Sequence, residues 1–531
     1  MEVAPAPPAP LVLDEDPVGL EDLHAVAVER RPLALGAGAR ERMGRARDLL
    51  DRLVGEERLI YGVTTGYGPL ATEHVGPARS AELQRNLVYH LAAGAGPPLS
   101  AEHTRAVMAA RAASLSRGHS ALRPEALDLL LACLRHDVLP VIPSMGTVGA
   151  SGDLTPLAHM TLALMGEGEV VWEGRRLPAA HALAACGLEP LALGHKEGLA
   201  FVNGTSAMTG IAAVTGVAAE RAAHLGLALT ALYAELLRGR AEAYHPAIGR
   251  VRPHPGQVEA LDRLGRLLDG SGRLRPHEGP PRLADLDADG LRHRQPILQD
   301  PYTVRCAPQL YGAVLDVLRF HRQTVETELN SVTDNPTFFP DDDLVLHGGN
   351  FYGQHVSFAA DALTNAVVKV AVHAERVVAR VTDRSLNGGL PAFLQARETG
   401  LHSGFMGAQV TATAVLAEMR AKSAPASTQS IPTNANNQDV VTMGTIAARR
   451  AAELTEHLYT VLAVGALVLA QGLEIEGGFT PGGGFAPASL ALAAWVRERS
   501  PFLDRDRPLH GDVAAVAHAL RYDPLPEAVA G

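Results

Sequence analysis

Four long stretches without proline, each with apolar residues three and four positions apart, constrain the fold more than any other feature of the sequence. They cover Gly204–Tyr244, Gln309–Thr333, Gly353–Asn387 and Gln438–Ile475. This spacing predicts α-helices with an apolar face, and at about 1.5 Å per residue such helices are long rods. The run TVLAVGALVLAQG from Thr460 is apolar around most of its circumference, so it belongs inside a bundle. The sequence therefore predicts a mainly α fold with a long-helix bundle as its core.

Turn-rich pieces interrupt the helical pattern before about residue 200. They occupy Tyr61–Leu70, Ala92–Pro98 and Pro143–Pro156, where glycine and proline gather. We therefore predict a loop-rich N-terminal domain over residues 1–200, with a lid loop around Tyr61, and a second part over residues 201–531 that holds the central bundle and C-terminal helices. Arg273–Pro296 mixes proline, glycine and alternating charges without apolar periodicity, which predicts an exposed crossing loop.

The charge balance argues against nucleic acid and membranes as partners. Acidic residues number 58 against 47 basic ones, and the formal net charge is −11 without any basic block. An anionic polymer or membrane surface therefore has no complementary face to bind. The longest apolar run, Leu458–Ala470, is shorter than the ~18 to 20 residues needed to cross a bilayer, so we interpret it as a buried helix.

The cysteines indicate a reducing compartment. Cys133, Cys186 and Cys306 lie far apart without CxxC spacing, which argues against a disulfide framework or a zinc knuckle. HExxH and paired cysteine or histidine spacings are absent from the sequence, so we expect no metal. The N-terminus is rich in proline and acidic residues, unlike a secretory signal, and we expect a cytoplasmic protein.

The segment Gly146–Pro156 is the part of the sequence that can carry chemistry. Three glycines, one alanine and one serine fall between Gly146 and Gly152, so the backbone can bend sharply there. A phosphate-binding loop would need Lys followed by Ser or Thr after the glycines, and a hydrolase elbow would need glycine at position 153, where Asp153 stands. The HGGN run at His347 follows the serine, whereas the hydrolase oxyanion motif precedes it. A self-modifying tripeptide, or a tight turn before a helix capped by Asp153 or Thr155, remains open.

Seven motifs decide between these possibilities, because together they resemble the aromatic amino acid ammonia-lyase family over nearly the whole chain, in the family's order. They are YGVTTGYGPL from Tyr61, NLVYHLAAG from Asn86, FVNGTSAM from Phe201, QDPYTVR from Gln299, NSVTDNP from Asn330, GGNF from Gly348 and TNANNQD from Thr433. The resemblance implies that Ala150, Ser151 and Gly152 cyclise to 4-methylidene-imidazole-5-one (MIO), an electrophile made from the chain itself. It implies no diffusible cofactor, and makes the N-terminal domain the MIO-bearing one.

The resemblance also implies a set of site residues. Tyr61 matches the tyrosine that removes the β-proton of the substrate, and Arg305 matches the arginine that binds the substrate carboxylate. Asn203 matches the asparagine near MIO and the amino group, and Tyr302 counts among the catalytic residues. The other positions that would order the site or bind the substrate are Gln299, Asn335, Phe351, Asn437 and Gln438. Outside this context, such residues are more often half-buried aromatics, surface ion pairs or turn caps.

Selectivity depends on His90, Leu91 and Gln438. Histidine-specific relatives resemble Ser-His at the first two positions and have Glu at the third, whereas plant phenylalanine-specific members resemble Phe-Leu and tyrosine-specific members His-Leu. An imidazole at His90 can pair with a phenolic hydroxyl in an apolar pocket, and leaving such a group unpaired costs ~1 to 3 kcal/mol. The simpler interpretation is a histidine that bonds only a neighbouring carbonyl.

We therefore expect an enzyme that converts L-tyrosine to trans-4-coumarate and ammonia, with lower activity on L-phenylalanine to give trans-cinnamate. The resemblance implies a homotetramer whose active sites are shared between subunits. The alternatives are a tyrosine 2,3-aminomutase, a phenylalanine or histidine ammonia-lyase and, from other classes, a serine hydrolase or an inactive helical scaffold. Each of the last two would leave Ser151 as an ordinary serine.

Overall fold

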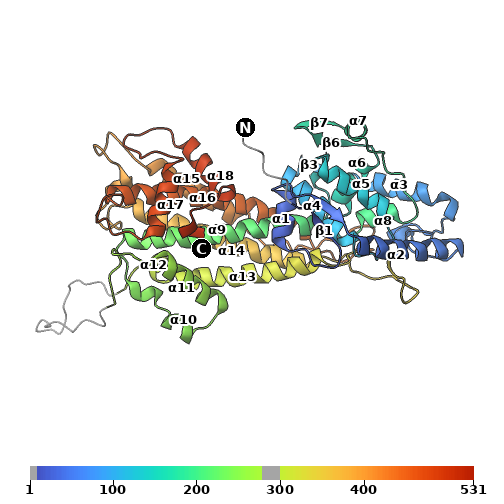
Figure 1. Ribbon diagram of the computed structural model, residues 1–531, viewed down its shortest axis with the longest axis horizontal. Helices are drawn as coiled ribbons and strands as arrows, with labels where there is room; N and C mark the ends of the chain where they lie inside the picture. Colours follow the sequence, from blue (N-terminus) through green and yellow to red (C-terminus); the bar gives the residue numbers. More distant parts are fainter. Residues whose placement is uncertain (1–8, 278–298, 531) are drawn as a thin grey trace, which may run out of the picture. The chain divides into compact units, whose positions relative to one another are not determined.

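Each of the four proline-free stretches forms one long helix. The computed structural model describes residues 9–277 and 299–530. The helices are α9 Ser206–Leu236, α13 Ala307–Leu329, α14 Gln354–Thr382 and α16 Gly444–Ile475 (Figure 1). Helix α9 ends before the predicted Tyr244, because Arg238 adopts a left-handed conformation (φ 52°) that closes the last turn. The prediction of a mainly α fold built on long helices is confirmed.

The chain divides into two compact units, each assembled from three segments. Unit 1 holds the residues up to Val217 together with Phe320–Ala362 and Pro425–Ala452, and unit 2 holds Ala218–Arg319, Leu363–Ala424 and the residues from Glu453 onwards. The predicted division into residues 1–200 and 201–531 cuts the sequence once, whereas these units interleave along it. That division stays a prediction about sequence domains.

Unit 1 contains short helices and small sheets around the start of α9. Its helices are α1 Leu20–Ala27, α2 Ala37–Gly55, α3 Ser80–Leu91, α4 Ala101–Leu115, α5 Pro124–Arg135, α6 Leu154–Leu164, α7 Ala179–Ala185 and α8 Glu197–Val202. Its strands are β1 Leu11–Leu13, β2 Leu33–Leu35, β3 Ala95–Pro98, β4 Leu139–Pro140, β5 Pro143–Met145, β6 Glu169–Trp172, β7 Arg175–Pro178, β8 Thr337–Phe339 and β9 Leu344–Leu346. One large apolar cluster joins α3, α4, α5, α6 and α8.

Two strand pairs of unit 1 bring distant segments to one place. Strand β3 pairs antiparallel with β5, with Ala95 opposite Met145, so the chain that leaves α3 runs beside the start of the glycine-rich segment. Strands β8 and β9 form a hairpin in which Thr337 lies opposite Leu346. Its Phe338 packs into a second apolar cluster with residues of α2.

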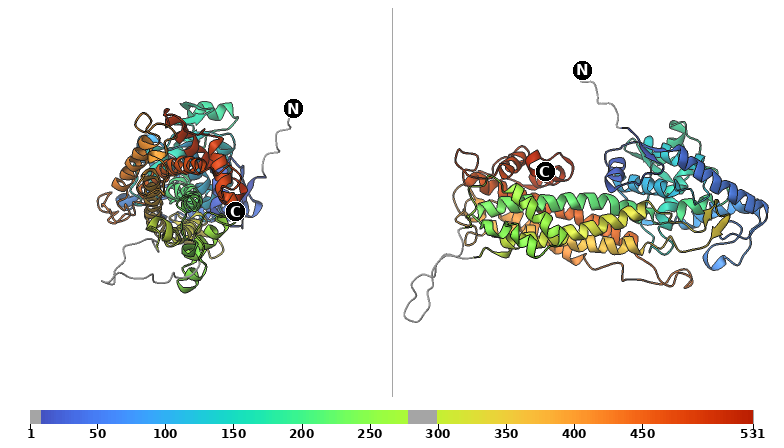
Figure 2. Two further views of the ribbon diagram at one scale, coloured as in Figure 1. Left: turned by 90° about the vertical axis from the view of Figure 1, so that its left-hand side faces the viewer. Right: turned by 60° about the horizontal axis from the view of Figure 1, so that its bottom comes forward.

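Unit 2 is a helical assembly. Its remaining helices are α10 Ala247–Val251, α11 Pro255–Leu267, α12 Tyr302–Arg305, α15 Met406–Ala421, α17 Pro487–Arg497, α18 His510–Tyr522 and α19 Glu527–Ala530. The unit 2 parts of the four long helices lie side by side (Figures 1 and 2). A narrow gap between them is lined by one residue from each helix, namely Gly226, Tyr311, His373 and Leu462. A Cβ at Gly226 would lie 2.4 Å from the Tyr311 hydroxyl, so a glycine there permits the close approach. Of the predicted crossing loop Arg273–Pro296, residues 278–296 lie outside the described residues.

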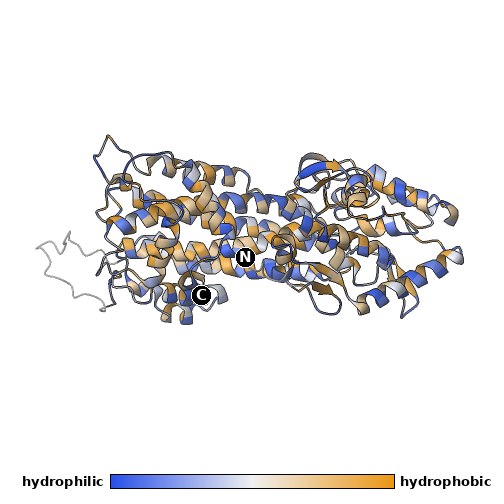
Figure 3. Cartoon of the chain, turned by 45° about the horizontal axis from the view of Figure 1, so that its top comes forward, coloured by the Kyte–Doolittle hydropathy of each residue, from blue (hydrophilic) through white to orange (hydrophobic). Residues whose placement is uncertain are grey.

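Burial agrees with the apolar pattern of α16. Val461, Leu462, Val464, Leu467 and Leu469 have no exposed surface. Within the described part of the chain, α16 alone is long and apolar enough to cross a membrane, but 83% of its apolar window is buried inside the protein. Elsewhere apolar and polar residues alternate along the helices (Figure 3). The run from Thr460 is therefore the core helix that its sequence predicted.

Candidate active site

A cavity of about 760 Å³ in unit 1 gathers most of the residues that the sequence singles out. Its predicted members are Tyr61, His90, Leu91, Ser151, Asn203, Asn335, Phe351, Asn437 and Gln438. These residues come from α3, from the ends of α8 and the β8–β9 hairpin, and from four loops. Ala150 and Gly152 flank Ser151 in the chain. The cavity thus joins segments that are hundreds of residues apart, and the role of each residue stays a prediction.

Residues 150 to 152 form a tight bend at the cavity wall. Ala150 and Gly152 pair across the bend, and Gly152 also pairs with Gly204. Gly152 has φ +72°, and a Cβ there would lie 2.1 Å from the carbonyl oxygen of Gly204. Only glycine fits this position, since a side chain would meet both strain and a clash. The next residue is held as well, because the N–H of Asp153 donates to the same Gly204 oxygen (2.7 Å).

Ser151 is held by one hydrogen bond to its side chain and one to its backbone carbonyl. Nε2 of Gln438 donates to Ser151 Oγ (3.2 Å), and Nδ2 of Asn203 donates to the Ser151 carbonyl oxygen (3.0 Å). Thr433 Oγ1 in turn bonds Gln438 Oε1 (2.7 Å), which orients the amide. No imidazole or carboxylate in the described part of the chain is hydrogen-bonded to Ser151 Oγ, so this geometry lacks the base that a serine hydrolase needs.

The bend fits a self-formed ring. A small residue on each side of Ser151, a backbone that doubles back from Ala150 to Gly152, and a serine hydroxyl free of ionic partners are the features that such cyclisation requires. Among the described residues there is no group of three or more His, Cys, Asp or Glu side chains placed to hold a metal ion.

Asp153 does not cap the following helix with its side chain, contrary to one reading of the sequence. Its carboxylate turns the other way and accepts hydrogen bonds from the N–H of Met208 (2.7 Å), in the first turn of α9, and from the hydroxyl of Thr445. The other capping candidate, Thr155, donates instead to the carbonyl of Gly146 (2.9 Å). Asp153 is fully buried, and burial raises the pKa of its carboxyl to about 6. The Asp153 carboxylate therefore accepts from the first turn of α9, which is distant in the sequence, and not from the first turn of α6, which directly follows it.

Tyr61 is held at both ends. Its phenol oxygen accepts a hydrogen bond from the N–H of Gly68 (2.9 Å), and its own N–H donates to Nε2 of His347 (3.3 Å). The ring meets that of Tyr67 edge to face, with centroids 6.3 Å apart. Tyr67 is largely buried, and burial raises the pKa of its phenol.

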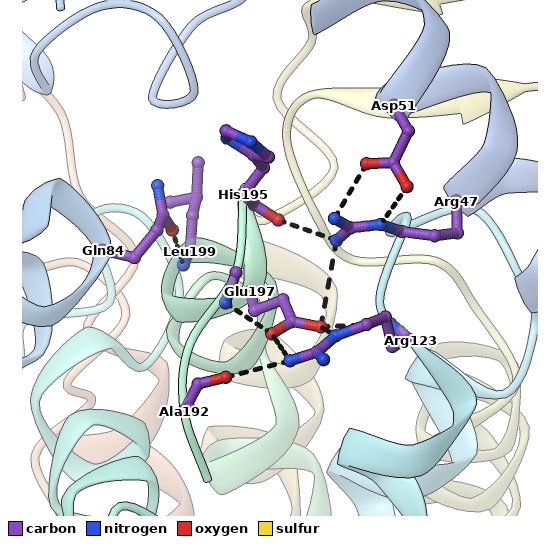
Figure 4. Close-up of polar contacts among 9 residues, drawn as sticks. Arg47, Asp51, Gln84, Arg123, Ala192, His195, Glu197 and Leu199 are labelled. Atoms are coloured by element: carbon purple, nitrogen blue, oxygen red, sulfur yellow. Dashed lines mark hydrogen bonds and ion pairs between the residues drawn. The ribbon is translucent and has the colours of Figure 1, made fainter. Parts of the chain in front are cut away.

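Gln84, a fully buried residue of α3, ties the Tyr61 loop to its surroundings. Its Nε2 donates to the carbonyl of Gly62 (2.8 Å) and to the hydroxyl of Tyr67 (3.1 Å). Its Oε1 accepts from the N–H of Leu199 in α8 (2.9 Å), a bond visible in Figure 4. The loop, α3 and α8 are therefore joined through one amide.

Helix α8, which ends just before Asn203, is anchored by its first residue. The buried carboxylate of Glu197 accepts from Nε and Nη2 of Arg123 (both 2.6 Å), as Figure 4 shows. It also accepts from the N–H of Gly194 (2.7 Å). Arg47 reaches the same region and donates to the carbonyl of His195 (3.1 Å). Charge-assisted bonds to a buried carboxylate fix the start of α8, and so the position of Asn203 at its end.

A buried ion pair supports Asn335. Nζ of Lys196 lies 2.7 Å from Asp334 Oδ2, and neither side chain is exposed. Burial lowers the pKa of Lys196. The Asn335 side chain accepts from the N–H of Gly348 (2.8 Å) at the open end of the β8–β9 hairpin. Breaking such a buried pair would leave an uncompensated charge, so the pair holds the backbone next to Asn335 in place.

Apart from Ala150 and Gly152, which flank Ser151, three predicted site residues do not line the cavity. Gln299, Tyr302 and Arg305 belong to unit 2, where Tyr302 and Arg305 are the two ends of α12. Tyr302 is 71% exposed, and the guanidinium carbon of Arg305 lies 4.5 Å from the centre of its ring. Nε of Arg305 is buried without a hydrogen-bond partner in the described structure.

Sequence reasoning missed several apolar lining residues. The apolar part of the cavity wall includes four leucines, Leu83, Leu87, Leu154 and Leu199. Two of them were within reach of the pattern, because Leu83, Leu87 and Leu91 follow one another at helical spacing on α3. Leu199 and Leu154 depend on how α8 and α6 pack, which no local pattern gives.

Comparison with known proteins matches nearly the whole chain. The family described as aromatic amino acid lyase matches residues 18–498. A tyrosine ammonia-lyase of Cereibacter sphaeroides is 47% identical, over 98% of this chain and 100% of its own length, and a histidine ammonia-lyase of Symbiobacterium thermophilum is 42% identical, over 96% and 97%. Among solved structures, a tyrosine aminomutase from Streptomyces globisporus superposes with a TM-score of 0.91 at 39% identity, covering 97% of both chains.

Proposed function

This chain belongs to the aromatic amino acid lyase family and is a carbon–nitrogen lyase, and from that premise we propose that it eliminates ammonia from L-tyrosine to give trans-4-coumarate. Lower activity on L-phenylalanine, giving trans-cinnamate, belongs to the same proposal. One observation carries it: Ser151, Tyr61 and His90 line a single cavity. A relative that is a tyrosine ammonia-lyase supports the choice of substrate.

The proposal includes MIO, formed by the chain itself. The Gly152 nitrogen bonds the Ala150 carbonyl carbon, whose oxygen leaves as water, and Ser151 then loses its hydroxyl and α-proton as a second water. The group supplies an electrophile that activates the substrate for loss of its amine. The Asn203 and Gln438 amides, which bond Ser151, would keep the tripeptide oriented during this reaction.

The chain's own residues would supply the remaining chemistry. Tyr61 takes the β-proton, and its two hydrogen bonds hold it for that step. His90 receives the phenolic hydroxyl of the substrate, and the leucines of α3 surround the ring. Asn335 and Phe351, which line the same cavity, would provide a carboxylate partner and an aromatic contact. Water exclusion by the Tyr61 loop strengthens these contacts.

The carboxylate partner Arg305 would come from a neighbouring subunit in a homotetramer. The exposure of Tyr302, at the other end of α12 from Arg305, supports this, because an exposed aromatic ring can be covered by a neighbouring subunit. We also propose a cytoplasmic location, supported by three cysteines that are free in the structure.

A direct assay tests the proposal. Purified protein is given tyrosine, phenylalanine or histidine while the ultraviolet absorbance of the acrylate product is followed, and products are separated afterwards. Coumarate and ammonia in equal amounts support the lyase. A tyrosine 2,3-aminomutase, favoured by the similar solved structure, would instead accumulate β-tyrosine. Urocanate as the main product would assign the chain to histidine.

A further inference from the structure

His347 follows the β8–β9 hairpin and opens the HGGN run. Its Nε2 lies 3.3 Å from the backbone nitrogen of Tyr61. A backbone N–H can only donate, so Nε2 is the acceptor and the ring proton sits on Nδ1. Partial burial lowers the pKa of His347, which favours this neutral form. The His347 imidazole therefore accepts a hydrogen bond from the backbone of Tyr61 and does not contact its phenol through this bond.

The same end of the hairpin also meets the substrate side of the cavity. Asn335 precedes β8 and accepts a hydrogen bond from Gly348, the residue after His347 (2.8 Å). Phe351 lies a few residues further on and lines the cavity. The β8–β9 hairpin and the residues next to it therefore hold His347, which contacts Tyr61, together with the cavity residues Asn335 and Phe351.

The far end of the hairpin is attached to α2, the helix that leads into the Tyr61 loop. Asp341 pairs with Arg45, and Asp343 pairs with Arg52. These pairs are exposed, so each contributes little to stability. The apolar cluster beneath them does more, since it joins Leu50 and Val54 of α2 and Ile60 and Val63 of the loop to Phe338 of the hairpin.

We propose that His347 is a positioning residue for Tyr61: by accepting the Tyr61 N–H, it locks the backbone of the proton-abstracting residue to the hairpin that carries Asn335. The proposal rests on the proposed function. The phenol oxygen is fixed by Gly68 at the other end. Losing the backbone bond lets the ring move relative to the substrate β-carbon, and a displacement of this kind lowers the rate of the chemical step rather than binding.

Two substitutions separate the acceptor from the imidazole. His347→Leu removes the acceptor, whereas His347→Gln offers an amide oxygen at about the same reach. With tyrosine we expect His347→Leu to lower kcat about 10-fold with little change in KM, and to raise the isotope effect of β-deuterated tyrosine. His347→Gln should recover most of the rate. Asn350→Ala serves as control, because Asn350 lies in the same loop and bonds Val332 instead.

Amide hydrogen exchange provides a readout that needs no activity. In full-length protein, His347→Leu should speed exchange over residues 58–66, while His347→Gln and Asn350→Ala leave it at the wild-type rate. The proposal would be overturned if the His347→Leu variant kept the kcat and the amide exchange rate of the wild type. It would also be overturned if His347→Gln lowered kcat as strongly as His347→Leu. If the wild type releases no coumarate, the proposed function fails, and the exchange comparison alone still decides whether His347 holds Tyr61.

Discussion

Nδ1 of His90 donates a hydrogen bond to the backbone carbonyl of Asn86, one helical turn earlier on α3, at 3.0 Å. Because a carbonyl can only accept, the proton of the neutral ring sits on Nδ1, and Nε2 remains an acceptor. The carbonyl bond and the specificity role are therefore compatible. A phenol that donates its O–H suits this acceptor.

Replacing this acceptor should change the preferred amino acid. In His90→Phe the phenolic hydroxyl has no partner, so relative kcat/KM should move from tyrosine toward phenylalanine by ~5 to 150-fold, the equivalent of ~1 to 3 kcal/mol. Steady-state kinetics on both amino acids measure this. Asn350→Ala is a suitable control, and an unchanged ratio in His90→Phe would remove the assigned role.

Ser151 and Gly152 should be indispensable for maturation. The intact mass of the wild-type chain should fall short of its calculated mass by two water molecules. Ser151→Ala has no hydroxyl to lose, and Gly152→Ala places a Cβ 2.1 Å from the Gly204 oxygen. Both variants should therefore lack lyase activity. A wild-type chain at its full calculated mass would contradict the MIO proposal.

Gln84 should matter for stability as well as for the loop. Gln84→Leu leaves the Gly62 carbonyl and the Leu199 N–H buried without this partner, so we expect a loss of about 2 to 4 kcal/mol in the free energy of unfolding. Denaturant titration measures the loss. The neighbouring exposed Arg85→Gln should stay within about 0.5 kcal/mol of wild type. Equal stability of the two variants would show that the amide bonds contribute nothing.

Acid should destabilise the protein through His373. Burial lowers the pKa of this histidine to about 4, against an ordinary value of 6.5. Between these values the unfolded chain binds a proton that the folded chain does not, so stability is lost as the pH falls. From pH 7 to pH 5 the wild type should lose about 2 kcal/mol more than His373→Gln. Chemical unfolding at both pH values gives the difference, with exposed His181→Gln as control, and parallel curves would refute it.

Shared active sites can be tested by mixing inactive chains. Ser151→Ala and Arg305→Ala should each be inactive or severely weakened as homotetramers. Co-expressed, they should regain activity, because some sites then combine an intact Ser151 with an intact Arg305 from another subunit. Activity no higher than that of the separate variants would mean that both residues must come from one chain.

The parts of the fold that follow from local pattern were predictable. Apolar spacing gave α9, α13, α14 and α16 with ends a few residues off, since the closing turn at Arg238 is a backbone event rather than a pattern. Nine residues of the cavity lining followed from motif resemblance, whereas Leu83, Leu87, Leu154 and Leu199 did not. Gln84 and His347 could not be assigned from sequence, because their partners are main-chain groups brought close only by tertiary packing. The contacts of Asp153 with Met208 and Thr445 could not be predicted for the same reason, and the alternative in which Asp153 caps the following helix is wrong.

The bend at Ser151 is clamped by pieces of chain that a ribosome makes at very different times. Gly204 is synthesised only about 50 residues after the bend. The other two contacts are made by residues that follow almost 300 residues after the bend: Thr442 donates to the Gly149 carbonyl (3.1 Å), and Thr445 donates to Asp153. A nascent chain that stops short of these threonines cannot hold the bend shut. We therefore expect the proposed cyclisation to begin only after Thr442 and Thr445 have been synthesised and have folded against the bend.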